Sequence, residues 1–96
     1  MYFTNLSTKL FFQFKAISKD CYYTVSTNGR CWKFMFDNDY GIALVKHVSL
    51  TQDDLWSAVA IRVEDHHYYP VDDIWLNRPV IEILEYAHLI KGGFFE

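Results

Sequence analysis

Residues 21–36, CYYTVSTNGRCWKFMF, predict a β-hairpin together with its strand pairing. Asn28-Gly29 is the strongest two-residue hairpin signal, because both turn positions need a positive φ that these residues tolerate. A turn centred there pairs Thr27 with Arg30, and each further pair follows from that register. One face then carries six apolar or aromatic side chains that must be buried, in the pairs Val25–Trp32, Tyr23–Phe34 and Cys21–Phe36.

The length and composition of the chain favour one folded domain. The sequence has 96 residues, of which 51% are hydrophobic and 19% aromatic, and it contains only four glycines and two prolines. A chain this rich in core-forming residues is not disordered as a whole, and its length suits one compact domain rather than two. We therefore expect a single domain over residues 1–96.

Neither a secretory signal nor a disulfide is expected. The start of the sequence, MYFTNLSTKLFFQFK, lacks the apolar run and cleavage site of a signal peptide, and no apolar run is long enough for a membrane span. This favours a cytoplasmic protein with no membrane segment. The predicted register places Cys21 and Cys31 on opposite faces and too far apart along the ladder for a bridge, so both thiols are expected to be free.

Two further stretches predict strands. Residues 8–17 alternate, with Phe12 and Phe14 on one side and Phe11 on the other, which is typical of a half-buried strand. Residues 42–48 are a β-branched run suited to a fourth strand. With the hairpin between them, these strands form an antiparallel meander.

The stretch 51–65 is ambiguous between helix and strand. Thr51-Gln52-Asp53-Asp54 resembles a helix capping box, and the side chains that follow share one arc of a helical wheel, which predicts a helix. A strand fits nearly as well, and the β-branched content favours it. That strand would turn inward Leu55, Val59, Ile61 and Val63.

A helix near the carboxyl end has the clearest pattern in the chain. Pro79 suits a first helical position, and Lys91-Gly92-Gly93 supplies a basic last turn and a cap. The apolar side chains recur at helical spacing, at Val80, Ile83, Leu84, Ala87 and Ile90. The predicted fold class is therefore α+β, with an antiparallel β-meander of about four strands covered by one or two helices.

The charge is distributed unevenly along the chain. Residues 1–36 carry five basic and one acidic side chain, whereas residues 37–96 carry eleven acidic and four basic ones. The net charge of −3 thus combines a basic first part with a larger acidic second part. This separation indicates a dipolar molecule whose dominant field is negative.

Asp65-His66-His67 resembles the Asp-His-His signature of a phosphoesterase family. The resemblance covers three residues, and the further acidic motifs of that family are absent from this sequence. Adjacent histidines in an extended segment also point in opposite directions, so one metal site captures only one of them. We expect an exposed polar loop over residues 65–73, with no metal and no cofactor.

Basic and aromatic side chains alternate on the outward face of the predicted first strands, which is the pattern of a single-stranded nucleic-acid platform. The net charge and the absence of a ribonucleoprotein motif argue against it. Nucleic-acid binding is therefore the alternative hypothesis rather than the leading one. The residues of this face are Lys9, Phe11, Lys15, Tyr22, Arg30 and Lys33.

Acidic and aromatic side chains gather in two predicted loops, where the rings offer contact area at low entropic cost and the carboxylates steer a basic partner. We predict that these residues bind the partner: Asp37, Asp39, Tyr40, Asp65, Tyr68, Tyr69, Asp72, Asp73 and Trp75.

The sequence as a whole favours a non-enzymatic, acidic binding protein. Its expected partner is a basic protein, such as the nuclease domain of a toxin or a nucleic-acid-binding protein, because such partners present a cationic groove. An immunity protein, an antitoxin or a phage-encoded inhibitor would have this role. No catalytic residues are predicted.

Overall fold

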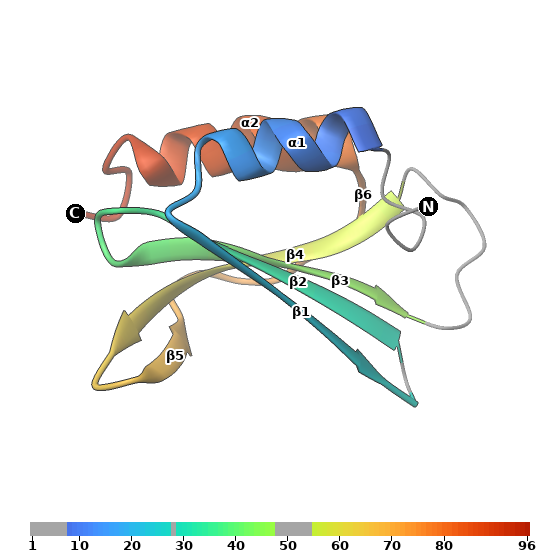
Figure 1. Ribbon diagram of the computed structural model, residues 1–96, viewed down its shortest axis with the longest axis horizontal. Helices are drawn as coiled ribbons and strands as arrows, with labels where there is room; N and C mark the ends of the chain where they lie inside the picture. Colours follow the sequence, from blue (N-terminus) through green and yellow to red (C-terminus); the bar gives the residue numbers. More distant parts are fainter. Residues whose placement is uncertain (1–7, 28, 48–54) are drawn as a thin grey trace.

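One antiparallel sheet, covered on one face by two helices, forms an α+β fold (Figure 1). The computed structural model describes residues 8–27, 29–47 and 55–96. Within them the elements are α1 (Thr8–Ala16), β1 (Asp20–Ser26), β2 (Gly29–Met35), β3 (Tyr40–His47), β4 (Leu55–Glu64), β5 (His67–Pro70), β6 (Trp75–Pro79) and α2 (Val80–Lys91). The strand order is β1-β2-β3-β4-β5, and β6 also pairs with β4. This confirms the predicted helix-covered meander.

The β1–β2 hairpin is confirmed, but its register differs by two residues from the prediction. Ser26 pairs with Gly29, and Tyr23 pairs with Trp32 instead of Phe34. The observed pairing brings the Tyr23 and Trp32 rings to a centroid distance of 4.7 Å, a favourable cross-strand aromatic contact. Because side chains alternate with a period of two, this shift leaves every side chain on its predicted face.

The predicted hairpin face forms one side of the main core. Trp32, Phe34 and Phe36 are buried, and Cys21 and Tyr23 pack against them. The prediction that Val25 is buried is wrong: this side chain lies near the end of β1 and is 67% exposed. Both cysteines are free thiols, as expected.

The prediction of a strand over residues 8–17 is wrong, because Thr8–Ala16 is helix α1. Phe11 and Phe14 are buried in the main core, with Leu10 and Ile17 packed beside them, whereas Phe12 is exposed. These inward positions follow helical spacing. The segment has apolar residues at both periods, and contact with α2 and the sheet favours the helix.

The helix predicted for residues 51–65 is also wrong. The described part, Leu55–Glu64, is strand β4, and the capping pattern at 51–54 lies outside the described residues. Trp56, Ala58 and Ala60 face the helices, where the small side chains leave room for α2. Because both faces of β4 carry apolar side chains, its sequence also fits the apolar arc of a helix. The opposite face carries Val59, Ile61 and Val63.

The prediction of a loop over residues 65–73 is only partly right. Asp65 and His66 form a turn, but residues 67–70 form strand β5, which folds back on β4 with Glu64 opposite His67. The helix near the carboxyl end is confirmed as α2, with all its predicted apolar side chains buried. It starts one residue later than predicted, because Pro79 is its N-cap.

The β4–β5 hairpin curls beneath the face of the sheet that the helices leave uncovered (Figure 1). A second, smaller core forms there from Met35, Ala43 and Ile61. Gly41 permits this packing, because a Cβ atom at its position would lie 2.6 Å from Met35 Sδ and would collide with the Phe34 carbonyl oxygen. The β4–β5 hairpin and Met35 therefore form part of the surface at one end of the sheet.

Candidate functional site

Five exposed carboxylates gather at one end of the sheet, which we call the acidic end. In an antiparallel meander the start of β1, the β2–β3 turn and the β4–β5 turn all lie at the same end. The acidic end therefore brings together side chains that are far apart in the sequence. These are Asp20, Asp37, Asp39, Glu64 and Asp65.

Tight turns fix the backbone of the acidic end. Asp65 and His66 have φ values of 52° and 66°, as both positions of a two-residue primed hairpin turn require. Asp39 has a φ of 67°, and its carbonyl oxygen accepts a hydrogen bond of 2.9 Å from the backbone N–H of Val63. Aspartate tolerates this left-handed conformation better than most residues. The β2–β3 turn is thus attached to the end of β4.

Only two of the five carboxylates have an ionic partner among the described residues. Glu64 pairs with Arg62 at 2.5 Å, and Asp37 pairs with Lys91 at 3.7 Å. No ion pair within residues 8–27, 29–47 and 55–96 involves Asp20, Asp39 or Asp65. Three exposed negative charges therefore remain available to an external cation.

A cleft of about 410 Å³ opens beside these charges. Its apolar wall comes from Met35 and Val63, and two tyrosine rings flank it, Tyr22 from β1 and Tyr68 from β5. Among the described residues, its lining is Lys19, Asp20, Tyr22, Met35, Phe36, Asp39, Val63, His66 and Tyr68. A cleft with apolar, aromatic and carboxylate groups suits an amphipathic cation.

The tyrosine rings already interact with charge. The Lys33 ammonium lies 5.0 Å from the centroid of the Tyr68 ring, within the range of a cation–π contact. On the other side of the cleft, the Asp20 carboxylate raises the pKa of the Tyr22 phenol above its ordinary value of 10, with smaller contributions from burial and from Tyr68. Asp20 therefore supplies the negative charge on this side of the cleft.

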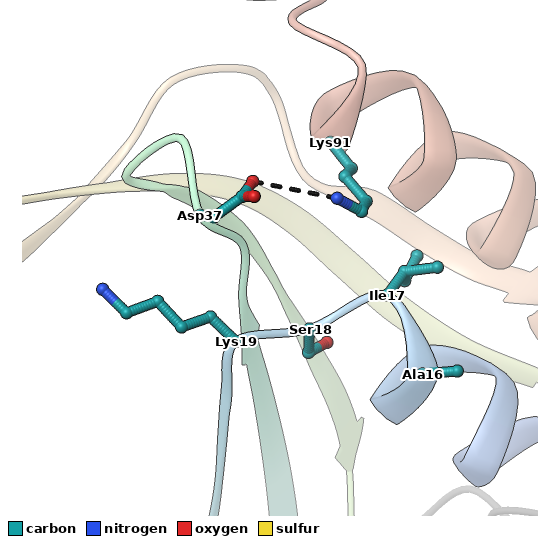
Figure 2. A pocket seen from close by; sticks show the side chains of 6 residues that line it. All are labelled: Ala16, Ile17, Ser18, Lys19, Asp37 and Lys91. Carbon is teal, nitrogen blue, oxygen red and sulfur yellow. Dashed lines mark ion pairs between the residues drawn. The ribbon is translucent and has the colours of Figure 1, made fainter.

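A smaller pocket of about 180 Å³ lies between the end of α1, the β2–β3 turn and the end of α2 (Figure 2). Its lining includes Asp37 and Lys91, whose ion pair joins the β2–β3 turn to the last turn of α2. Figure 2 shows the Lys19 side chain extending away from this pair. Because Asp37 is paired here, its charge is less available to a partner than that of Asp39.

Of the nine predicted binding residues, the acidic end includes Asp37, Asp39 and Asp65, and Tyr68 lines its cleft. Tyr69 lies next to Tyr68 on β5 and is also exposed. These five residues belong to the β2–β3 turn and the β4–β5 hairpin.

The other four predicted residues lie away from the cleft. Tyr40 packs against the core, and its hydroxyl donates a hydrogen bond of 3.2 Å to the Phe95 carbonyl oxygen. Trp75 stacks on Tyr86 at a centroid distance of 4.2 Å. Both rings thus contribute mainly to packing.

Asp72 and Asp73 are exposed in the connection between β5 and β6. The Asp72 carboxylate accepts a hydrogen bond of 2.9 Å from the Tyr86 hydroxyl, which anchors this connection to α2. Burial, followed by this hydrogen bond and the negative charge of Asp72, raises the pKa of Tyr86. Asp73 has no ion pair among the described residues.

The histidines of the Asp-His-His stretch lie on different elements. His66 is in the β4–β5 turn and lines the cleft, whereas His67 begins β5, with its ring centroid 6.4 Å from that of Tyr69. Within the described part of the chain, no group of three or more His, Cys, Asp or Glu side chains is arranged to hold a metal ion.

Of the nine described residues that line the cleft, only Asp39 and Tyr68 were predicted to bind the partner, and Asp20 and Tyr22 are among those missed. A signal for Asp20 existed, because the turns before β1 and after β2 must lie at the same end of any meander. Tyr22 was assigned instead to the basic face. That face does not form one platform, since Lys9 and Lys15 lie on α1, Phe11 is buried, and Arg30 points to the opposite side of the sheet from Lys33.

The chain matches no protein-family model, no curated protein and no solved structure. In the part of the chain described here, no helix combines the length and apolar character needed to cross a membrane.

Proposed function

We propose that this protein is a non-enzymatic binding protein that neutralises a basic protein partner through its acidic end. The observation that carries the proposal is the set of three exposed carboxylates without an ionic partner among the described residues, placed beside exposed tyrosine rings. Unpaired charges attract a partner of opposite sign, and tyrosines supply area that becomes buried on binding.

The arrangement suits an inhibitor of a protein that itself binds nucleic acid. The active groove of a nuclease or a nucleic-acid-binding machine is cationic because it must hold phosphates. Asp20, Asp39 and Asp65 lie on turns and a strand start that are fixed by hydrogen bonds and pairing, so they form a preorganised set of negative charges. An immunity protein, an antitoxin or a phage-encoded inhibitor has this kind of task.

The test is affinity capture from the cell that makes the protein, with the wild type and the triple variant Asp39→Asn, Asp65→Asn and Tyr69→Ala. We expect the wild type to capture a basic protein and the triple variant to lose most of it. Glu85→Gln is the matched control, because Glu85 is exposed on α2, away from the acidic end, and should leave capture unchanged.

Equal capture of the basic protein by the triple variant and the wild type would contradict the proposal. So would strong retention of the wild-type protein on immobilised polynucleotide that weakens steeply with salt, since this is the behaviour of a nucleic-acid-binding module. The purified complex also provides a functional readout, because the captured partner should lose its activity at equimolar inhibitor.

A further inference from the structure

We propose that the cleft at the acidic end is a receptor for one arginine side chain of the partner. This inference rests on the proposed function and specifies the group that the partner inserts. The cleft offers carboxylates from Asp20 and Asp39, tyrosine rings on two sides and an apolar wall. An arginine matches each of these features, because its planar guanidinium pairs with carboxylates and stacks on aromatic faces, while its stem packs on apolar surface.

The two carboxylates that line the cleft come from different elements of the sheet. Asp20 begins β1 and lies opposite Met35 of β2, while Asp39 lies in the β2–β3 turn. Neither has an ion pair with another described residue. A cation entering between them would therefore gain two carboxylates without displacing an existing partner.

The chain itself shows that one of the rings accepts a cation. Lys33 holds its ammonium 5.0 Å from the Tyr68 ring centroid on the face of the sheet that bears the cleft. Tyr22 faces the same side, opposite Lys33 in the strand pairing, and is 46% exposed. The cleft therefore offers a guanidinium aromatic surface to stack on, in addition to the two carboxylates.

Lys19 is the one lysine or arginine in the described lining of the cleft and, like Lys33, whose ammonium lies over the Tyr68 ring, it opposes an incoming cation. Its backbone N–H donates a hydrogen bond of 2.7 Å to the Met35 carbonyl oxygen, and its side chain is exposed. Removal of its charge by Lys19→Gln should therefore strengthen cation binding. An increase in affinity is a useful readout, because partial unfolding cannot produce it.

The test is an NMR titration of the full-length, ¹⁵N-labelled chain at low salt with Nα-acetylarginine methylamide. We expect saturable shifts of the amides of Asp20, Tyr22, Asp39 and His66. The neutral isostere Nα-acetylcitrulline methylamide should give no saturable shift, and the corresponding lysine probe should bind more weakly than the arginine probe.

The double variant Asp20→Asn and Asp39→Asn should bind the arginine probe about twofold to thirtyfold more weakly, as expected from the loss of two exposed ion pairs. Asp73→Asn is the matched control and should bind like the wild type, because Asp73 is exposed away from the cleft. Undiminished binding by the double variant, or equal binding of arginine and citrulline probes, would overturn the inference.

The two proposals fail in different ways. If the double variant Asp20→Asn and Asp39→Asn captures the basic partner as well as the wild type does, the cleft inference is wrong and the proposed function stands. If the arginine probe binds the cleft but no basic protein is captured, the proposed function is wrong, although the cleft still binds arginine.

Discussion

Replacing Phe11 by alanine should destabilise the protein far more than the same change at Phe12. Phe11 is buried in the main core, with its ring centroid 4.8 Å from that of Trp32 and 6.1 Å from that of Phe34. Truncation of such a ring removes its transfer free energy and leaves a cavity, at a cost of about 3–5 kcal/mol. Phe12 is 53% exposed and touches Phe11 edge-on, so its truncation should cost about 1 kcal/mol or less.

Urea denaturation followed by tryptophan fluorescence measures the difference. With a slope of about 1–3 kcal/mol per molar urea, Phe11→Ala should lower the midpoint by at least about 1 M, and Phe12→Ala by much less. If Phe11→Ala does not fold, Phe11→Leu, at a cost of about 1–1.5 kcal/mol, provides the comparison. Equal or greater loss from Phe12→Ala would refute the helical placement, because a strand over this segment turns Phe12 inward and Phe11 outward.

Two further substitutions test the contact that anchors the β5–β6 connection to α2 and the packing of the second core. Tyr86→Phe should cost about 1 kcal/mol at pH 7 through loss of the hydrogen bond to Asp72. The folded-state pKa of Tyr86 lies above its unfolded value of 10, so the unfolded chain ionises first as the pH rises. The difference in unfolding free energy between the wild type and Tyr86→Phe should therefore shrink above pH 10. An unchanged difference across that range, measured by urea denaturation, would contradict the assignment. Gly41→Ala should destabilise the protein by about 1–3 kcal/mol, because the added Cβ meets the Phe34 carbonyl and Met35 Sδ. Thermal denaturation measures this loss. An unchanged melting temperature would show that the second core does not depend on close packing at Gly41.

The local turn signal and the alternation of the hairpin were sufficient to predict β1, β2 and the face they bury. The exact register was not, because a shift of two residues keeps the same side chains inward. Ring contact between Tyr23 and Trp32 favours the observed pairing. The pattern that predicts α2 was equally clear, since the apolar side chains predicted at helical spacing are all buried.

The segments that were predicted wrongly carry apolar residues at two periods at once. Phe11 and Phe12 are adjacent in α1, so the segment satisfies an alternating and a helical pattern alike. Strand β4 is apolar on both faces, because one packs under the helices and the other forms the second core. Tertiary contacts therefore decided both segments, and local sequence could not.

The acidic character of the site could be predicted, but its geometry could not. The charge asymmetry and the aromatic loops indicated the β2–β3 turn and the β4–β5 hairpin. The β4–β5 turn with Asp65 joined Asp20 and the β2–β3 turn only because β4 is a strand, which places that turn at the same end of the sheet as the start of β1. Trp75 and Tyr40 resembled contact residues in the sequence, yet their rings pack against Tyr86 and Phe95.

The most direct measurement is backbone amide shift mapping of the ¹⁵N-labelled protein in complex with its captured basic partner. The acidic end is predicted to carry the contact, so the largest changes should fall at Asp20, Asp39, Asp65 and Tyr68. Changes confined to the outer faces of α1 and α2, with these four amides unmoved, would contradict the assignment of the acidic end as the binding surface.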